Sequence, residues 1–127
     1  MTERRPVTSR GAPAAIGPYT QAIKVDDWVW TSGQIGLDPE SGEMVEGGVA
    51  AQTERALQNL EAVLSIAGSS MQQAVRCTVY LVDMADFEAV NEVYAKFFRD
   101  PPPARSTVAV AGLPKGALVE VDCVAVR

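Results

Sequence analysis

The sequence predicts a single α+β domain in which a mixed sheet carries two helices on one face. The chain has 127 residues, enough to bury one hydrophobic core and too few for a second independent domain, so residues 1–127 form one unit. Strand-like segments are interrupted by two segments whose apolar residues recur at helical spacing. Each helical segment follows a strand, as expected of crossover connections that place helices on one side of a sheet.

The N-terminal part of the chain predicts a strand hairpin. Residues 29–33 have the aromatic and β-branched composition of a strand, and residues 21–25 form its partner across a turn at residues 26–27. An additional strand is expected near residues 5–8. The Asp, Pro, Ser and Gly residues of the segment 38–42 then predict a turn.

A long helix is predicted over residues 48–67. Its apolar stripe consists of Val49, Ala56, Leu57, Leu60, Val63, Leu64 and Ala67. Gly68 directly after this segment suits the left-handed residue that ends many helices. Residues 74–82 alternate and are rich in β-branched side chains, which predicts a strand, and Asp83 follows as the expected N-cap of a second helix.

The predicted core stripe of the second helix is Phe87, Val90, Tyr94 and Phe97. The three prolines at 101–103 are expected to end this helix. Two strands follow over residues 106–111 and 117–126, so the order is β-β-α-β-α-β-β. Because the strands carry apolar residues on both sides, we expect the face without helices to pack against other copies of the chain.

The charge balance argues against nucleic acid and membranes as partners. The net charge is −5 and the pI is about 4.6, and the sequence has no cluster of Lys and Arg with interspersed aromatic residues. No apolar run reaches the roughly 18 residues of a transmembrane helix, and Arg4 and Arg5 are followed by prolines rather than by the apolar segment of a signal peptide. We therefore expect a cytoplasmic protein.

The chain contains no histidine and two cysteines, Cys77 and Cys123. It therefore lacks the ligand set of a zinc or haem site and the base of a Ser-His or Cys-His pair. Each cysteine lies in an apolar pattern of period two, so both thiols are expected on buried strand faces.

Charged residues interrupt the last two predicted strands. Arg105 and Thr107 share one face of their strand, and Glu120 and Asp122 share one face of theirs. A charge in a strand needs a partner, a ligand or water, because burying it alone is very unfavourable. The pattern alone favours a structural ion pair or a solvated face, and it also allows a site in which Arg105 holds a ligand carboxylate while Glu120 handles a proton.

Short motifs follow one another along nearly the whole chain. They are residues 14–19 (AAIGPY), 31–35 (TSGQI), 78–81 (TVYL), 87–91 (FEAVN) and 103–106 (PARS), extended by 113–115 (LPK) and 119–121 (VEV). One such motif alone would carry little weight. As an ordered set, they resemble the RidA/YjgF family of reactive intermediate deaminases.

This resemblance implies a chorismate-mutase-like α+β fold that assembles as a barrel-like homotrimer with clefts at the subunit interfaces. It implies hydrolysis of short-lived enamines and imines, such as 2-aminoacrylate and 2-iminopropionate, to a 2-keto acid and ammonia. It implies neither a cofactor nor a metal ion. A protonated imine is already electrophilic, so positioning, water activation and proton delivery meet the chemical demand without a nucleophilic residue.

At matched positions, Arg105 resembles the carboxylate anchor of the family, and Glu120 resembles the residue that activates water. Other matched positions line the family's cleft: Tyr19, Ser32, Gly33 and Asn91. Without the resemblance, Tyr19 could equally be a packing aromatic, Ser32 a turn residue and Asn91 the cap of a loop.

Thr107 departs from the family pattern, because many of the family's deaminases carry cysteine at this position. A substrate-binding role of its backbone would tolerate threonine, whereas a role of the thiol would be lost. The segment between Phe98 and Arg105 also looks shortened and rich in proline, which would reshape the rim of the cleft.

Two other functions remain open from the sequence. A non-catalytic module could use the same cleft to bind 2-keto acids or to regulate a partner protein. RNA cleavage or inhibition of translation is ascribed to some relatives, but the acidic balance and the lack of histidine argue against it here.

Overall fold

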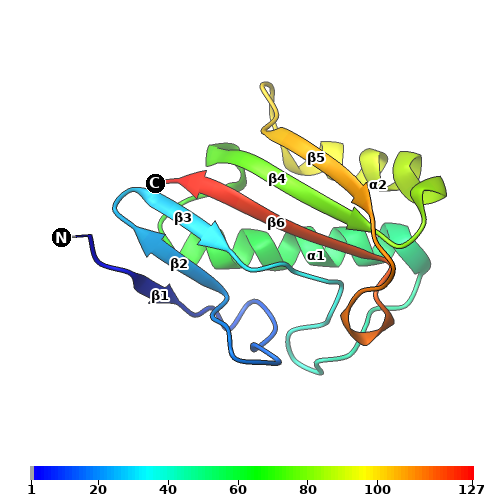
Figure 1. The fold of residues 1–127 in the computed structure, drawn as a ribbon, viewed down its shortest axis with the longest axis horizontal. Helices are drawn as coiled ribbons and strands as arrows, with labels where there is room; N and C mark the ends of the chain where they lie inside the picture. The colour runs from blue at the N-terminus through cyan, green and yellow to red at the C-terminus, as the bar shows by residue number, and fades with distance from the viewer. Residues whose placement is uncertain (1) are drawn as a thin grey trace.

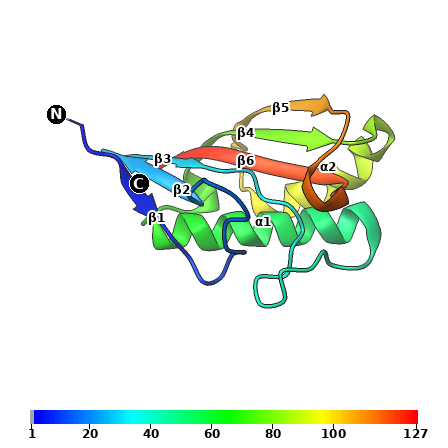
Figure 2. The same ribbon diagram turned by 60° about the horizontal axis from the view of Figure 1, so that its bottom comes forward.

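The computed structural model, which describes residues 2–127, contains one mixed sheet with the strand order β1-β2-β3-β6-β4-β5. The strands are β1 (Arg5–Val7), β2 (Ala22–Val25), β3 (Trp28–Thr31), β4 (Ala74–Leu81), β5 (Ala104–Ala109) and β6 (Val119–Val126). The helices α1 (Gly48–Ile66) and α2 (Phe87–Tyr94) lie on one face of this sheet and leave the other face bare (Figures 1 and 2). The predicted α+β fold and element order are confirmed.

The hairpin predicted near the N-terminus is formed by β2 and β3. These strands pair antiparallel, with Val25 opposite Trp28, and the turn between them places Asp26 at a φ of 52°. The additional strand β1 pairs antiparallel with β2 at the edge of the sheet. The chain leaves β3 after Thr31, so Gly33 lies in the following loop and not in the strand as the sequence suggested.

Helix α1 supplies most of the core beneath the sheet. The side chains of Leu57, Leu60 and Leu64 are fully buried, as the helical stripe predicted. Gly68 adopts a φ of +84°, and its N–H donates to the Ser65 carbonyl at 3.1 Å while the next N–H donates to Leu64 at 2.8 Å. These two bonds form the Schellman arrangement that satisfies the last carbonyls of a helix, which confirms the predicted helix end.

Helix α2 differs from the prediction at both ends. Asp83 caps a 3-10 turn over Met84–Asp86, where its side chain accepts from the N–H of Ala85, and the α-helix begins only at Phe87. Val90 and Tyr94 are buried, but Phe87 is 38% exposed because it lies at the start of the helix and turns its ring toward strand β5 rather than into the core. The helix also ends at Tyr94, before the prolines, and a 3-10 turn over Ala95–Phe97 follows. Phe97 reaches the core as a partly buried side chain from this turn.

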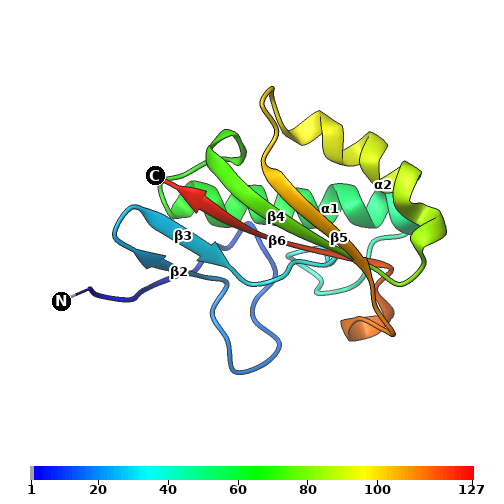
Figure 3. The same cartoon turned by 45° about the horizontal axis from the view of Figure 1, so that its top comes forward.

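Strand β4 lies between β5 and β6, the two strands that carry the charged candidate site residues. It pairs parallel with β5 and antiparallel with β6, so β5 and β6 are not neighbours. Cys77 on β4 lies directly opposite Cys123 on β6, and both thiols are buried, as predicted. Helix α2 lies at the β4–β5 side of the sheet (Figure 3).

The segment between β3 and α1 is tied to the helix by a buried amide. Asn59 on α1 is fully buried, and its side-chain nitrogen donates to the carbonyl oxygens of Ile35 at 3.2 Å and Leu37 at 3.0 Å. Gln34 in the same segment also bridges to Val121 on β6. The loop that follows Gly33 is therefore held at a fixed distance from the sheet.

The bare face of the sheet carries exposed apolar side chains. Trp28, Trp30 and Val108 are 43%, 54% and 41% exposed. The apolar composition of this face was predicted, and its packing against other copies of the chain stays a prediction. None of the helices in residues 2–127 is long and apolar enough to cross a membrane.

Replacement of Asn59 by alanine should destabilise the fold, because it leaves the buried Leu37 carbonyl without a donor and removes one of the two donors to the Ile35 carbonyl, which also accepts from the Leu37 N–H at 2.8 Å. We expect Asn59→Ala to lower the free energy of unfolding by about 2–4 kcal/mol. Urea denaturation measures this change, and Glu61→Ala on the exposed side of the same helix is the control, with an expected change within about 0.5 kcal/mol. A loss no larger than that of the control would contradict the anchoring role of Asn59.

Candidate active site

Arg105 projects from β5 toward helix α2, where three side chains hold its guanidinium group. Its Nη2 donates to Oδ1 of Asn91 at 2.8 Å. The guanidinium carbon lies 4.7 Å from the centre of the Tyr94 ring and 5.6 Å from that of the Phe87 ring. These distances are those of cation–π contacts, and residues 87, 91 and 94 lie on one face of the helix. One face of α2 therefore fixes the position of this cation.

Among residues 2–127, Arg105 has no counter-ion. The ion pair found in residues 2–127 joins Arg5 to Glu3 at 3.1 Å, and no carboxylate lies within 4 Å of the Arg105 guanidinium. Asn91 takes one of its donors, which leaves the others free. A half-buried guanidinium with free, coplanar donors is suited to bind a carboxylate with two hydrogen bonds.

Thr107 lies two residues further along β5, on the same side of the strand as Arg105. Its register partner on β4 is Val79. The N–H of Val110 donates to Leu81 on β4 at 2.8 Å. Because backbone groups alternate between the two sides of a strand, the N–H and C=O of Thr107 point away from β4. They line the outer edge of β5, where the described residues provide no partner strand.

Glu120 lies on the opposite face, at the bare side of β6. Its carboxyl group contacts the loop after β3, where a Cβ atom on Gly33 would lie 2.6 Å from Oε2 of Glu120. Any side chain at position 33 would thus displace this carboxyl group. The absence of a side chain at Gly33 is what allows Glu120 to lie against the loop.

Tyr19 and Ser32 lie near Glu120. The Tyr19 hydroxyl oxygen accepts from the N–H of Ile16 at 3.1 Å, so its own hydrogen remains available for donation. The Ser32 hydroxyl donates to the Thr20 carbonyl at 2.5 Å, so its oxygen remains available as an acceptor. With Glu120 they line a hollow of about 350 Å³ on the bare face.

The environment of Glu120 changes its acidity. Burial raises the pKa of Glu120 above its ordinary value of 4.5, and the negative charge of Asp122 raises it further. A carboxylate with a raised pKa is a stronger base than an ordinary glutamate, which suits it to accept a proton from water.

The structure places Arg105 and Glu120 on opposite faces of the sheet. Arg105 is in register with Cys77, and Cys77 is opposite Cys123, so these three side chains point toward the helices. Glu120 is opposite Tyr80 on β4. Tyr80 is an odd number of residues from Cys77, so Tyr80 and Glu120 point to the other face of the sheet, the bare one. Within one chain, therefore, the two residues do not meet, and the sequence hypothesis of a joint site holds only if two copies contribute.

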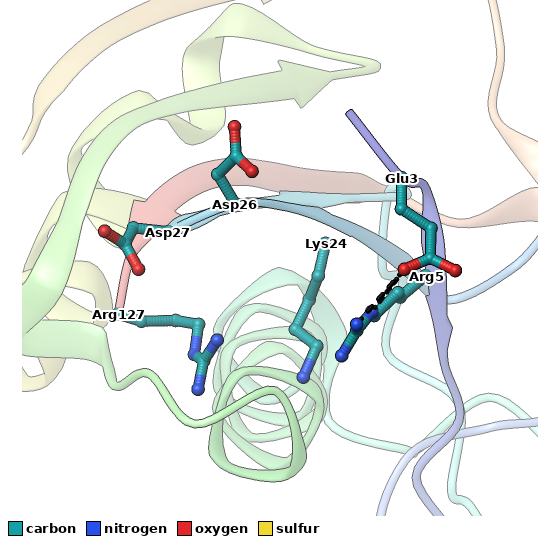
Figure 4. A pocket seen from close by; sticks show the side chains of 6 residues that line it. All are labelled: Glu3, Arg5, Lys24, Asp26, Asp27 and Arg127. Carbon is teal, nitrogen blue, oxygen red and sulfur yellow. Dashed lines mark hydrogen bonds and ion pairs between the residues drawn. The ribbon is translucent and has the colours of Figure 1, made fainter. Parts of the chain in front are cut away.

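The hollows of the surface follow the same division. Asn91, Tyr94 and Arg105 line one of about 450 Å³ next to α2, whereas Tyr19, Ser32, Gly33 and Glu120 line the other. A third hollow, of about 510 Å³, lies at the far end of the sheet; Arg5, Lys24 and Arg127 line it, Glu3 pairs with Arg5, and the Asp26 carboxyl points away from these cations (Figure 4). None of the predicted site residues lines this third hollow, and its charges balance.

Two contributions to the site were missed in the sequence. Phe87 and Tyr94 were assigned to the core, and their contact with Arg105 could have been inferred only from their common helix face with Asn91. Asp122 was recognised as sharing a face with Glu120, but no role was given to it. The structure places it at the same hollow as Glu120.

Comparisons with known proteins agree over nearly the full length. The family model described as endoribonuclease L-PSP matches residues 9–127. The chain is 52% identical over 125 residues to protein DfrA of Myxococcus xanthus, covering 97% of this chain and 95% of that protein. It is 47% identical over 124 residues to the 2-iminobutanoate/2-iminopropanoate deaminase of Mus musculus, covering 98% and 92%. The crystal structure of RidA from the Antarctic bacterium Psychrobacter sp. PAMC 21119 matches with a TM-score of 0.94 at 42% identity, covering 98% and 100%.

The raised pKa of Glu120 has a consequence for stability. The folded state holds the proton more tightly than the unfolded state, so this group stabilises the fold below pH 4.5 and loses that contribution as the pH rises through the folded-state pKa. Glu120→Gln removes the ionisation. We expect its free energy of unfolding, relative to wild type, to be higher at pH 7 than at pH 4, as measured by urea denaturation at both values.

An unchanged difference between pH 4 and pH 7 would show that Glu120 is not perturbed in the folded state. Glu40→Gln, on an exposed turn, is the matched control. Its stability relative to wild type should stay nearly constant between the two pH values.

Proposed function

The chain belongs to the endoribonuclease L-PSP family, also known as the RidA/YjgF family, and from this premise we propose that it hydrolyses reactive enamine and imine intermediates. Its substrates would be 2-aminoacrylate, its tautomer 2-iminopropionate and similar short 2-imino acids, and its products 2-keto acids and ammonia. Relatives that match nearly the whole chain carry the name of this deaminase activity. The observation that carries the proposal in the structure is Arg105, a positioned guanidinium that pairs with no carboxylate of the described part of the chain.

The reaction needs one water molecule and no redox step. Water adds to the iminium carbon of 2-iminopropionate and gives a carbinolamine, and a proton passes from the water to the nitrogen. The carbon–nitrogen bond then breaks as the hydroxyl group loses its proton, so pyruvate and ammonia leave, and the ammonia takes up the released proton to become ammonium. The protein must hold the carboxylate, accept a proton from water and return it to nitrogen.

Arg105 is the group that would hold the substrate carboxylate. Two parallel hydrogen bonds from its guanidinium would fix both the position and the plane of the imino acid. The contacts with Asn91, Tyr94 and Phe87 keep the guanidinium from turning away. In this arrangement Asn91 orients Arg105. This role is more specific than the one implied by the resemblance, in which Asn91 is one of several residues that line the cleft.

Glu120 would accept the proton of the attacking water. Its raised pKa favours this step, and the Tyr19 hydroxyl and the Ser32 oxygen at the same hollow offer a donor and an acceptor to water or substrate. The outward-facing N–H and C=O of Thr107 would bind the substrate from the Arg105 side of the cleft. This role uses the backbone, so it does not require a thiol at this position.

The opposite placement of Arg105 and Glu120 supports a homotrimer in which each cleft combines the Arg105 half of one copy with the Glu120 half of its neighbour. Exposed tryptophans on the bare face and the unpaired outer edge of β5 are the surfaces that such an assembly would cover. The small 2-imino acid would then bind between subunits.

RNA cleavage is a second candidate, because the description of the matching family model names an endoribonuclease. The chain has no histidine and a net charge of −5, so it lacks the usual general base for RNA cleavage, and its overall charge repels a phosphate backbone. Incubation of nuclease-free protein with single-stranded RNA tests this candidate, and we expect no cleavage.

Removal of the Arg105 guanidinium should abolish the deaminase activity. We expect Arg105→Ala to lower kcat/KM for 2-iminopropionate by about a hundredfold or more, because the substrate loses its charged anchor. The assay follows pyruvate release from imine generated in the cuvette, with the uncatalysed rate subtracted. Arg10→Ala, at an exposed arginine that lines neither of the two hollows, is the control and should behave as wild type.

Light scattering of Arg105→Ala should show the same assembly as the wild-type protein. Full activity of this variant would exclude Arg105 as the anchor. Binding of pyruvate by wild type without any turnover would instead support the non-catalytic module.

A shared cleft can be tested by mixing two inactive variants. Arg105→Ala and Glu120→Gln are co-expressed with different tags, and assemblies that carry both tags are purified. Each mixed trimer contains one cleft in which an intact Arg105 meets an intact Glu120, so we expect about one third of the wild-type activity. If the mixed trimers show no deaminase activity, Arg105 and Glu120 do not form a shared cleft between neighbouring copies.

A further inference from the structure

Asp122 is the second carboxylate at the Glu120 hollow. It lies two residues after Glu120 on the same face of β6, and both side chains line the hollow of about 350 Å³. Tyr19 and Ser32 line the same hollow. Two carboxylates of one strand thus line the same hollow, and the proposed function gives a role only to the carboxylate of Glu120.

Tyr80 holds Asp122 in place. Its hydroxyl donates to Oδ2 of Asp122 at 3.0 Å. In the register of β4 and β6, Tyr80 is the direct neighbour of Glu120, so its side chain crosses diagonally to Asp122. The hydrogen bond keeps the Asp122 carboxylate on the bare face beside Glu120 and limits its rotation toward solvent.

The charge around Glu120 comes mainly from this neighbour. From β6 it faces Asp122, from β4 the neutral hydroxyl of Tyr80, and from the N-terminal loop the hydroxyl of Tyr19. Lys115 follows Pro114 in the segment against the hollow, but its ammonium group donates to a backbone carbonyl of the loop before α1 at 3.4 Å. Thr31 at the end of β3 and residues 32–33 of the adjoining loop carry no ionisable group. Within one chain, no cation of the described residues therefore lies against Glu120 to offset Asp122. In the proposed cleft the Arg105 of the neighbouring copy is the facing cation, and the substrate carboxylate pairs with it.

We propose that Asp122, held by Tyr80, is a positioning residue that makes Glu120 a stronger base toward the attacking water. This inference rests on the proposed function, in which Glu120 accepts a proton from water. The water O–H bond breaks as its oxygen bonds to the imine carbon, and the proton moves to Glu120 and then to the departing nitrogen. Asp122 itself exchanges no proton with the substrate. Its fixed negative charge favours the protonated form of Glu120.

The direction of the pKa shift supports this role. Burial raises the pKa of Glu120, and Asp122 raises it further. Burial also raises the pKa of Tyr80, and the hydrogen bond to Asp122 adds to that effect, so the phenol stays a donor. Removal of the Asp122 charge should therefore lower the pKa of Glu120 and weaken it as a base.

The experiment measures the Glu120 carboxyl group directly, apart from activity. The full-length protein is labelled with ¹³C at glutamate side-chain carboxyls, Glu120 is assigned by its loss in Glu120→Gln, and its titration is followed by NMR. We expect Asp122→Asn to lower the pKa of Glu120 and Tyr80→Phe to lower it by less. Asp27→Asn, an exposed aspartate in the β2–β3 turn, is the matched control and should leave the titration unchanged.

The pH profile of kcat for 2-iminopropionate gives the second measurement. In Asp122→Asn the acidic limb should move to lower pH and the plateau should fall by about two- to fivefold. If this variant does not fold, Tyr80→Phe, which removes only one hydroxyl group, decides the outcome with the same two measurements.

A Glu120 titration that is the same in wild type, Asp122→Asn and Tyr80→Phe would overturn the inference, even if the wild-type protein is an active deaminase. A wild-type protein without deaminase activity would instead remove the proposed function, and the NMR titration would still show whether Asp122 acts on Glu120.

Discussion

The alternation of side chains along β6 governs both the core and the site. Val119, Val121 and Ala125 point toward the helices and are fully buried, whereas Glu120 and Asp122 point to the bare face. Because side chains in a strand alternate strictly, a shift of one residue in the pairing with β4 would bury both carboxylates under α1. The pairing of Cys77 with Cys123 therefore also fixes the face on which Glu120 and Asp122 lie.

Helix α2 combines two tasks in eight residues. Val90 faces the core, while Phe87, Asn91 and Tyr94 surround the guanidinium of Arg105. Tyr94 serves both, since it is buried and its ring lies against the cation. A change in core packing at this helix would consequently move the residue that is proposed to hold the substrate.

Local patterns predicted the fold well and the site only in part. The strand hairpin, the stripe of α1 and its end at Gly68 follow from residue spacing and turn chemistry, which act over a few positions. The parity of Arg105 within its strand was also visible, but the face it occupies depends on pairing with a strand more than twenty residues away. Phe87 was misassigned for a similar reason, because helical spacing cannot tell a contact with the core from a contact with an edge-strand arginine.

The unpaired edge of β5 and the apolar bare face also affect how the monomer behaves in solution. A newly made monomer displays both a free strand edge and exposed tryptophans, the features that favour aggregation. If the clefts form only between copies, the contacts that remove this hazard are also those that create activity. Dilution would then dissociate the assembly and abolish its activity while the separate chains are still folded. The turnover per chain would therefore depend on protein concentration.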